Sequence, residues 1–214
     1  MNGPVRLTEK YRPRRIEDFV GLPKIKTILM NFLKNPNPAA FLFSGDPGIG
    51  KTAVALAMAE ALHSTPLHLA SESCNYENLS KLLHECEMSP AFWNGEAARF
   101  HFILIDEVDS VTATAQRRLL SKLDASEFSN NAIFVFTTNT VKGLEERFVS
   151  RCMHLDFKMW GSSKEIIHFL CAVWHAEGGN GDSPDWVQVV KDRGMNVRDC
   201  LQVLEAELLA RGPR

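Results

Sequence analysis

The sequence lacks the long apolar runs and the leader pattern of membrane-spanning and secreted proteins. None of its apolar runs approaches the roughly 20 residues that a membrane-spanning helix needs, and its first residues are polar and basic. Its five cysteines include no Cys-x-x-Cys pair and are odd in number, which disfavours a zinc site and a disulfide framework. We therefore expect reduced thiols, no membrane partner, and a cytoplasmic or nucleoid-associated protein.

A strong net charge, internal repeats and low-complexity segments are also missing. The formal net charge is −2 at pH 7, so the chain as a whole lacks the basic excess of many nucleic-acid-binding domains. A local basic cluster near the N-terminus fits either a solvated arm or a contact surface, and it comprises Arg6, Lys10, Arg12, Arg14 and Arg15. A length of 214 residues suits one domain with, at most, a small appendage.

The most specific motif is GDPGIGKT, which follows a short apolar run and opens a helix-forming stretch. Its glycines let successive backbone N–H groups face a phosphate, and the positive end of the following helix adds to that field. Lys51 brings a charge to the β- and γ-phosphates, and the Thr52 hydroxyl can ligate Mg²⁺. The motif predicts a nucleoside triphosphate site made of Gly45, Asp46, Pro47, Gly48, Ile49, Gly50, Lys51, Thr52 and Ala53.

A second motif is an apolar run of strand length, Phe100 to Ile105, that ends in acidic residues. Such a run fits a strand that merely ends in a polar turn, but together with the phosphate loop it predicts the other half of the site. Asp106 is placed to hold the Mg²⁺ shell. Glu107 is placed to orient or deprotonate the attacking water.

The hydrophobic pattern predicts an α/β fold, a five-stranded parallel αβα sandwich followed by a small three-helix lid. Strands are expected at 39–44, 67–70, 100–105, 133–137 and 153–157, and helices at 16–33, 53–62, 79–88, 113–123, 164–176, 184–192 and 197–210. We expect residues 1–15 to be extended, because Pro4 and Pro13 disfavour a helix, and residues 89–99 to be irregular. The predicted division is an arm over 1–20, a nucleotide-binding core over 21–160 and a lid over 161–214.

Further stretches resemble the AAA+ ATPases, and among them the small subunits of sliding-clamp loaders of the replication factor C type. EKYRP at 9–13, followed by IEDFVG at 16–21, is similar to the clamp-loader EKYRP…(I/L)xDxVG segment. DEVDSVT at 106–112 with Ala115-Gln116 is similar to its DEADxxT…AQ stretch, and 150–152 matches its SRC motif.

The resemblance implies a role for each matching residue, although each also fits a plainer one. Tyr11, Arg12 and Val20 would line the adenine pocket or serve packing alone. Asn139, at the sensor-1 position, would place water beside Glu107 or cap a turn.

Three arginines complete the implied site. Arg151, with Arg147 as a second candidate, would reach the γ-phosphate held by a neighbouring subunit, or would be a surface arginine. Arg198 would be the sensor-2 arginine of the lid, or an exposed helix residue.

The implied function is ATP hydrolysis coupled to conformational change, in a homo- or hetero-oligomer that acts with a sliding clamp and DNA in replication or repair. Arg117, Arg118 and Lys81 are candidates for phosphate or subunit contacts. A protein remodeller or helicase loader, and a nucleotide-held scaffold with slow turnover, are the alternatives. Clamp-loader subunits usually continue into a helical collar domain, and this sequence, ending at Arg214, fits either a truncated chain or a compact relative without a collar.

Overall fold

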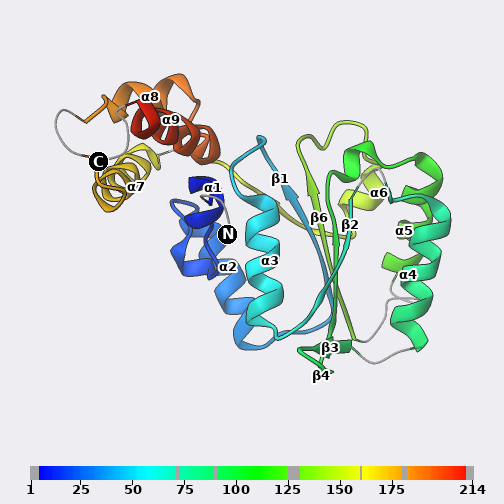
Figure 1. The fold of residues 1–214 in the computed structure, drawn as a ribbon. Coiled ribbons are helices and arrows are strands. Elements are labelled where there is room, and N and C mark those ends of the chain that lie inside the picture. The colour runs from blue at the N-terminus through cyan, green and yellow to red at the C-terminus, as the bar shows by residue number, and fades with distance from the viewer. Residues whose placement is uncertain are drawn as a thin grey trace.

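The computed structural model describes residues 5–70, 73–88, 91–124, 131–159, 161–179 and 183–210. At its centre lies a five-stranded parallel sheet with the strand order β2-β5-β6-β1-β7 (Figure 1). The strands are β1 (Ala39–Ser44), β2 (Pro66–Leu69), β5 (His101–Ile105), β6 (Ala132–Thr138) and β7 (Met153–Asp156). β1 pairs with β6 on one side and β7 on the other, so that Phe41 lies opposite Val135 and Met153. The predicted fold class is confirmed.

Two helical layers cover the sheet, and they explain why its central strands are almost wholly apolar (Figure 1). Phe41 and Phe43 pack on one side, whereas Leu42 packs on the other, as the alternation of side chains along a strand requires. The first layer holds α2 (Pro23–Lys34) and α3 (Lys51–Ala61), and the second holds α4 (Tyr76–Met88) and α5 (Ala113–Leu123). In the described ranges, no helix has the length and apolar character to cross a bilayer.

Three helices after the sheet pack on one another and on the N-terminal segment. They are α7 (Ser163–Ala176), α8 (Trp186–Asp192) and α9 (Val197–Ala210). Trp174 and Trp186 meet edge to face with ring centroids 5.8 Å apart. The division into an arm, a core and a lid stays a proposal, and we use the word lid below for α7, α8 and α9. Residues 1–4 of the predicted arm and residues 180–182 and 211–214 of the predicted lid lie outside the described part of the chain.

The expectation of an extended arm is wrong, because α1 (Leu7–Lys10) is a single helical turn. It fits between the two prolines, and the carbonyl of Arg6 accepts hydrogen bonds from the N–H groups of Glu9 and Lys10. Leu7 is buried, and its N–H donates to Oε1 of Glu205 in α9 at 3.2 Å. Packing against the lid therefore outweighs the low helix propensity of so short a segment.

The single helix expected at 16–33 is also wrong at its start. The chain forms a 3₁₀ turn, η1 (Ile16–Asp18), and then breaks at Gly21 and Leu22, which have φ angles of +68° and +57°. α2 begins only at Pro23, where a missing N–H costs nothing.

The stretch expected to be irregular contains a hairpin, β3 (Ala91–Trp93) paired antiparallel with β4 (Glu96–Ala98). Asn94 and Gly95 form its turn with positive φ, which these two residue types adopt most readily.

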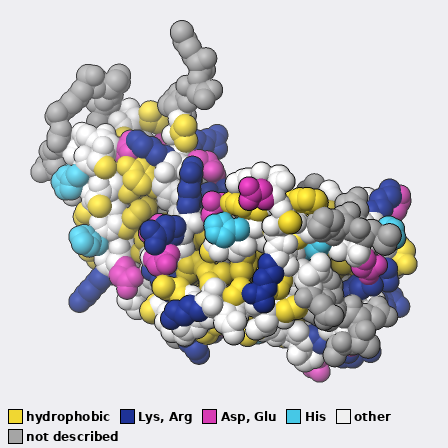
Figure 2. All heavy atoms as spheres, turned by 90° about the horizontal axis from the view of Figure 1, so that it is seen from below, with side chains coloured by type: hydrophobic (Ala, Val, Ile, Leu, Met, Phe, Trp, Pro, Cys, Tyr) yellow, Lys and Arg dark blue, Asp and Glu magenta, His cyan; other side chains and the backbone are white. Residues whose placement is uncertain are grey.

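Figure 2 views the molecule from this end, and hydrophobic side chains gather near the middle of the face, with Lys and Arg around them. A short helix, α6 (Glu146–Val149), and a 3₁₀ turn, η3 (Val108–Ser110), complete the elements that we did not expect.

Candidate functional site

A cavity of about 600 Å³ opens at the carboxyl ends of the strands, between the core and the lid. Its volume falls within the roughly 300–1,000 Å³ of small-molecule sites. Open parallel sheets bind ligands at this edge. The lining includes Thr8, Tyr11, Arg12, Val20, residues 47–53, His68, Asp106, Glu107, Asn139, Phe169, Val197 and Arg198.

The phosphate loop connects β1 to α3 and is shaped by its glycines. Gly48 and Gly50 have φ angles of +79° and +99°, which side-chain-bearing residues adopt at a cost. A Cβ on Gly48 would also lie 2.4 Å from Oδ1 of Asn196, at the start of α9. The lid therefore touches the loop directly, and Nδ2 of Asn196 donates to the carbonyl of Pro47 at 3.0 Å.

Lys51 spans the loop from the first turn of α3, and its side chain is buried. Its ammonium donates to the carbonyls of Gly45 at 2.7 Å and Asp46 at 2.9 Å, and to Oδ1 of Asn139 at 2.9 Å. The pKa of Lys51 is lowered from its ordinary value, because burial disfavours the charged ammonium. The surrounding carboxylates, Asp46 first among them, act in the opposite direction and offset only part of this lowering. A phosphate in the loop would give this charge the anionic partner that carbonyl and amide oxygens replace only in part.

Asp106 lies directly after β5 and is fixed by three hydrogen bonds. Its Oδ1 accepts from the hydroxyls of Thr52 at 2.9 Å and Thr137 at 2.8 Å, and its Oδ2 contacts Nε2 of His68 at 2.9 Å. The hydroxyl and carboxylate oxygens are the hard donors that Mg²⁺ prefers, so Thr52 and Asp106 fit this ion. Among the residues that the structure describes, no group of three His, Cys, Asp or Glu side chains is arranged to hold a metal ion.

Glu107 lines the cavity beside Asp106 in a strained backbone conformation. Its φ is +52°, and its N–H donates to Oγ1 of Thr137 at 3.1 Å. Thr137 thus ties the two acidic residues together. A left-handed non-glycine residue costs of the order of 1–3 kcal/mol, and such strained residues cluster at active sites and ligand-binding sites.

Tyr11 joins the arm to the lid at the other end of the cavity. Its ring meets that of Phe169 edge to face at 6.3 Å, and its hydroxyl donates to Oε1 of Glu177. Burial and the Glu177 carboxylate raise the pKa of Tyr11 to about 12. Lys10, which lies 2.7 Å from Glu177, and the Tyr11 hydroxyl in turn lower the pKa of Glu177.

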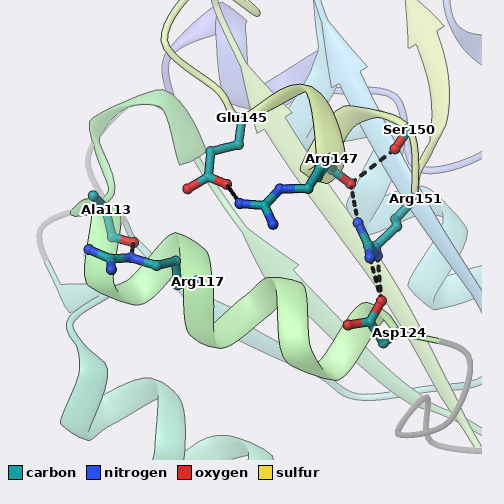
Figure 3. A network of polar contacts seen from close by, with 7 residues as sticks. All are labelled: Ala113, Arg117, Asp124, Glu145, Arg147, Ser150 and Arg151. Atoms are coloured by element: carbon teal, nitrogen blue, oxygen red, sulfur yellow. Dashed lines mark hydrogen bonds and ion pairs between the residues drawn. The ribbon is translucent and has the colours of Figure 1, made fainter.

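Arg151 has its partners elsewhere, and the described residues that line the cavity do not include it. Its Nε and Nη2 lie 2.7 and 2.5 Å from Oδ1 of Asp124, at the end of α5, and its Nη1 donates to the carbonyl of Arg147 at 2.9 Å (Figure 3). Arg147 itself pairs with Glu145 at 3.0 Å. The guanidinium of Arg151 is therefore paired within its own chain.

The weaker basic candidates have local partners. Arg117 donates to the carbonyl of Ala113 (Figure 3), Arg118 lies over the ring of Tyr76, and Lys81 pairs with Glu77. In the basic cluster near the N-terminus, Lys10, Arg12 and Arg15 pair with Glu177, Glu9 and Glu17.

The sequence predicted which motif residues would lie together at the site, but not the side chains that contact them. His68, Asp124 and Glu177 were not predicted to take part. The signal for His68 was a polar residue in the middle of a short apolar strand that precedes the acidic one. Asp124 and Glu177 carry no comparable signal, because both lie just beyond helix ends where acidic residues are ordinary.

Comparison with known proteins places these features in a family. The family model described as "ATPase family associated with various cellular activities (AAA)" matches residues 41–159, more than half of the chain. The chain is 33% identical over 151 residues to a replication factor C small subunit of Methanocella arvoryzae, covering 68% of this chain and 45% of that protein. It is 30% identical over 153 residues to a replication factor C small subunit of Archaeoglobus fulgidus, covering 70% of this chain and 47% of that protein. The chain thus spans less than half the length of these curated relatives.

Solved structures agree on the fold. The RuvB Holliday junction branch migration motor of Thermotoga maritima superposes with a TM-score of 0.74 at 16% identity, covering 91% of this chain and 64% of that one. A likeness at this identity concerns the fold alone. With the family match over most of the core, the phosphate loop and the acidic strand end, the chain belongs to the AAA family of ATPases.

Proposed function

We propose that this chain binds ATP with Mg²⁺ between its core and its lid and hydrolyses it, as a clamp-loader-like subunit that acts on DNA in replication or repair. The observation that carries the proposal is the single cavity that joins the phosphate loop, the Thr52–Asp106 pair, Glu107 and the lid.

Each polar group of the cavity has its own role in the proposed hydrolysis. Lys51 binds the β- and γ-phosphates in place of its present carbonyl partners. Thr52 and, through water, Asp106 are the residues that would hold Mg²⁺, whose charge offsets that of the phosphates when it is bound. Glu107 takes a proton from the attacking water, and Asn139 orients that water.

The arm and the lid close the site around the base and the phosphates. Tyr11, Arg12 and Val20 surround the adenine, while Arg198 approaches from α9. The contact between Asn196 and Pro47 supports coupling of the lid to the loop, because a change at the loop alters a bond that the lid makes.

The assembly and the substrate are inferred from the relatives. Similarity to replication factor C small subunits supports an oligomer of AAA+ subunits that works with DNA and a sliding clamp. In such an oligomer Arg151 would complete the site of the neighbouring subunit, where a guanidinium stabilises the charge that develops during phosphoryl transfer.

The test is steady-state ATP hydrolysis with and without primed double-stranded DNA, together with ATP binding. We expect Glu107→Gln to bind ATP but to lose about 10²-fold or more of the turnover, as for loss of a general base. Lys51→Met should lose the binding as well. The matched control is Glu96→Gln, in the hairpin at the other end of the sheet, which should leave both unchanged.

Each outcome points to one function. Turnover that DNA stimulates supports the proposal. Turnover indifferent to DNA would favour a protein remodeller, and tight binding without turnover would favour a nucleotide-held scaffold. Failure to bind ATP would overturn the proposal altogether.

A further inference from the structure

His68 contacts the carboxylate on which the proposed Mg²⁺ site depends. Its Nε2 lies 2.9 Å from Oδ2 of Asp106, while the hydroxyls of Thr52 and Thr137 both donate to Oδ1. His68 also lines the cavity. The imidazole therefore serves the one carboxylate oxygen that these hydroxyls do not reach.

The sheet brings His68 to this place. β2 pairs in parallel with β5, so that His68 lies opposite Leu104, and the N–H of Asp106 donates to the carbonyl of Leu69 at 3.1 Å. Leu67 and Leu69 pack against the α4–α5 side of the core, and alternation along the strand turns His68 to the other face. The position is therefore a consequence of register and does not depend on a mobile loop.

The chemistry of the two groups determines which of them donates the hydrogen bond between His68 and Asp106. An ionised carboxylate has no hydrogen to give, so Nε2 carries the proton and donates. The terminal torsion of an aspartate is soft, so a carboxylate that is held at one oxygen only can turn about its own axis. Two hydroxyls at Oδ1 and an imidazole at Oδ2 together hold both oxygens of Asp106.

We propose that His68 is a positioning residue that holds Asp106 in the orientation from which it binds the Mg²⁺ shell. This inference rests on the proposed function, in which Asp106 serves the metal. Partners of metal-binding groups commonly contribute about 10- to 100-fold to metal affinity. His68 acts through Asp106, and its loss should therefore change the requirement for Mg²⁺ and not the grip on the nucleotide itself.

The experiment is the binding of a fluorescent, non-hydrolysable ATP analogue to the full chain, measured in EDTA and across a Mg²⁺ titration. We expect His68→Ala to need about tenfold more Mg²⁺ for half-maximal strengthening of binding, with unchanged affinity in EDTA. His68→Gln, whose amide also donates from the end of its side chain, should recover most of the loss. His84→Ala, a surface histidine on α4, is the matched control and should behave as the wild type.

The outcomes separate this inference from the proposed function. Wild-type protein that does not bind the analogue would overturn the proposed function. Wild-type binding that responds to Mg²⁺, with the same Mg²⁺ requirement in His68→Ala, would overturn the role of His68 alone. An equal loss in EDTA and in Mg²⁺ would also overturn it, since His68 would then serve the nucleotide or the fold. If the alanine variant does not fold, His68→Gln against His68→Leu asks the same question, because both fill the volume and only glutamine donates.

Discussion

Arg151 is the residue whose observed partners differ most from its proposed role. It is paired with Asp124 and Arg147 of its own chain, whereas the role that we propose for it is to serve a neighbouring subunit (Figure 3). The side chains of Arg151 and Asp124 are 31% and 46% exposed, and an ion pair this open to solvent contributes at most about 1 kcal/mol. In the proposed oligomer, a phosphate on a neighbouring subunit would therefore compete for the guanidinium at little cost.

Removing the charge of Asp124 tests this competition. We expect Asp124→Asn to raise ATP turnover of the assembled protein by up to about fivefold, which corresponds to about 1 kcal/mol, because Arg151 is then released more readily. Steady-state hydrolysis at matched subunit concentration measures the effect. Glu145→Gln, which removes the partner of Arg147 instead, is the control. A fall in turnover would mean that Asp124 orients Arg151 for the reaction and does not withhold it.

Among the elements, the arm is the one whose contacts were least expected. α1 packs on α9, and Tyr11 and Lys10 both bind Glu177 at the end of α7. These contacts attach the lid to the segment from Thr8 to Arg12, which lines the cavity. The arm is thus part of the wall of the site.

The hydroxyl of Tyr11 gives this attachment a measurable dependence on pH. The pKa of Tyr11 is raised from 10.0 to about 12 in the folded protein, so between these values the folded protein keeps a proton that the unfolded chain loses. Its contribution to stability is therefore complete below pH 10 and is lost as the pH rises toward 12.

We expect Tyr11→Phe to lower the free energy of unfolding by about 1 kcal/mol at pH 8, the usual value of one hydrogen bond, and the difference from wild type to shrink above pH 10. Denaturant unfolding at several pH values from 8 to 11 measures this. The sequence has only two tyrosines, so Tyr76→Phe, at an exposed position on α4, is the natural control. A difference between wild type and Tyr11→Phe that stays constant across pH 10 would contradict the assignment.

The elements also show how far the sequence alone could predict this molecule. β1 and α5 begin and end at the expected residues, because a full apolar strand and a well-capped amphipathic helix carry their own signals. The hairpin of β3 and β4 has three residues on each strand, too few for an alternating pattern to be seen. α1 is stabilised by a lid nearly 200 residues away in sequence, which no local pattern reports.

Within the candidate site, too, some features could be predicted from the sequence and others could not. The loop from Gly45 to Thr52 is contiguous, and its spacing alone brings its residues together. Asp106 lies near it because parallel strands end at one edge of the sheet. The contacts of His68 and Asp124 depend on strand order and helix packing, so the structure was needed to find them.

For the whole molecule, the proposed role of Arg151, which lies away from its own cavity, would make activity a property of pairs of subunits. Glu107→Gln and Arg151→Ala should each be inactive alone. Mixed in equal amounts in an assembly of identical subunits, they should recover about a quarter of the wild-type rate, since one interface in four then combines an intact Glu107 with a neighbour's intact Arg151.

Steady-state hydrolysis at fixed total protein measures this recovery. The control is a mixture of Glu107→Gln with Lys51→Met, both of which damage the same cavity, and it should stay inactive. No recovery in the first mixture, with both variants shown to assemble, would contradict an Arg151 that acts in trans.

The bond between Leu7 and Glu205 joins residues 198 positions apart in the sequence, and the cavity wall runs from Thr8 to Leu201. During synthesis the sheet and its helices can form from the emerging chain, but the wall stays open until α9 has left the ribosome. Contacts of such long range are also slow to form, because the loop entropy is lost before the contact is made. A ribosome-bound chain halted before α9 would therefore carry the phosphate loop without the last part of its cavity wall, and the wall would close only when α9 packs on α1.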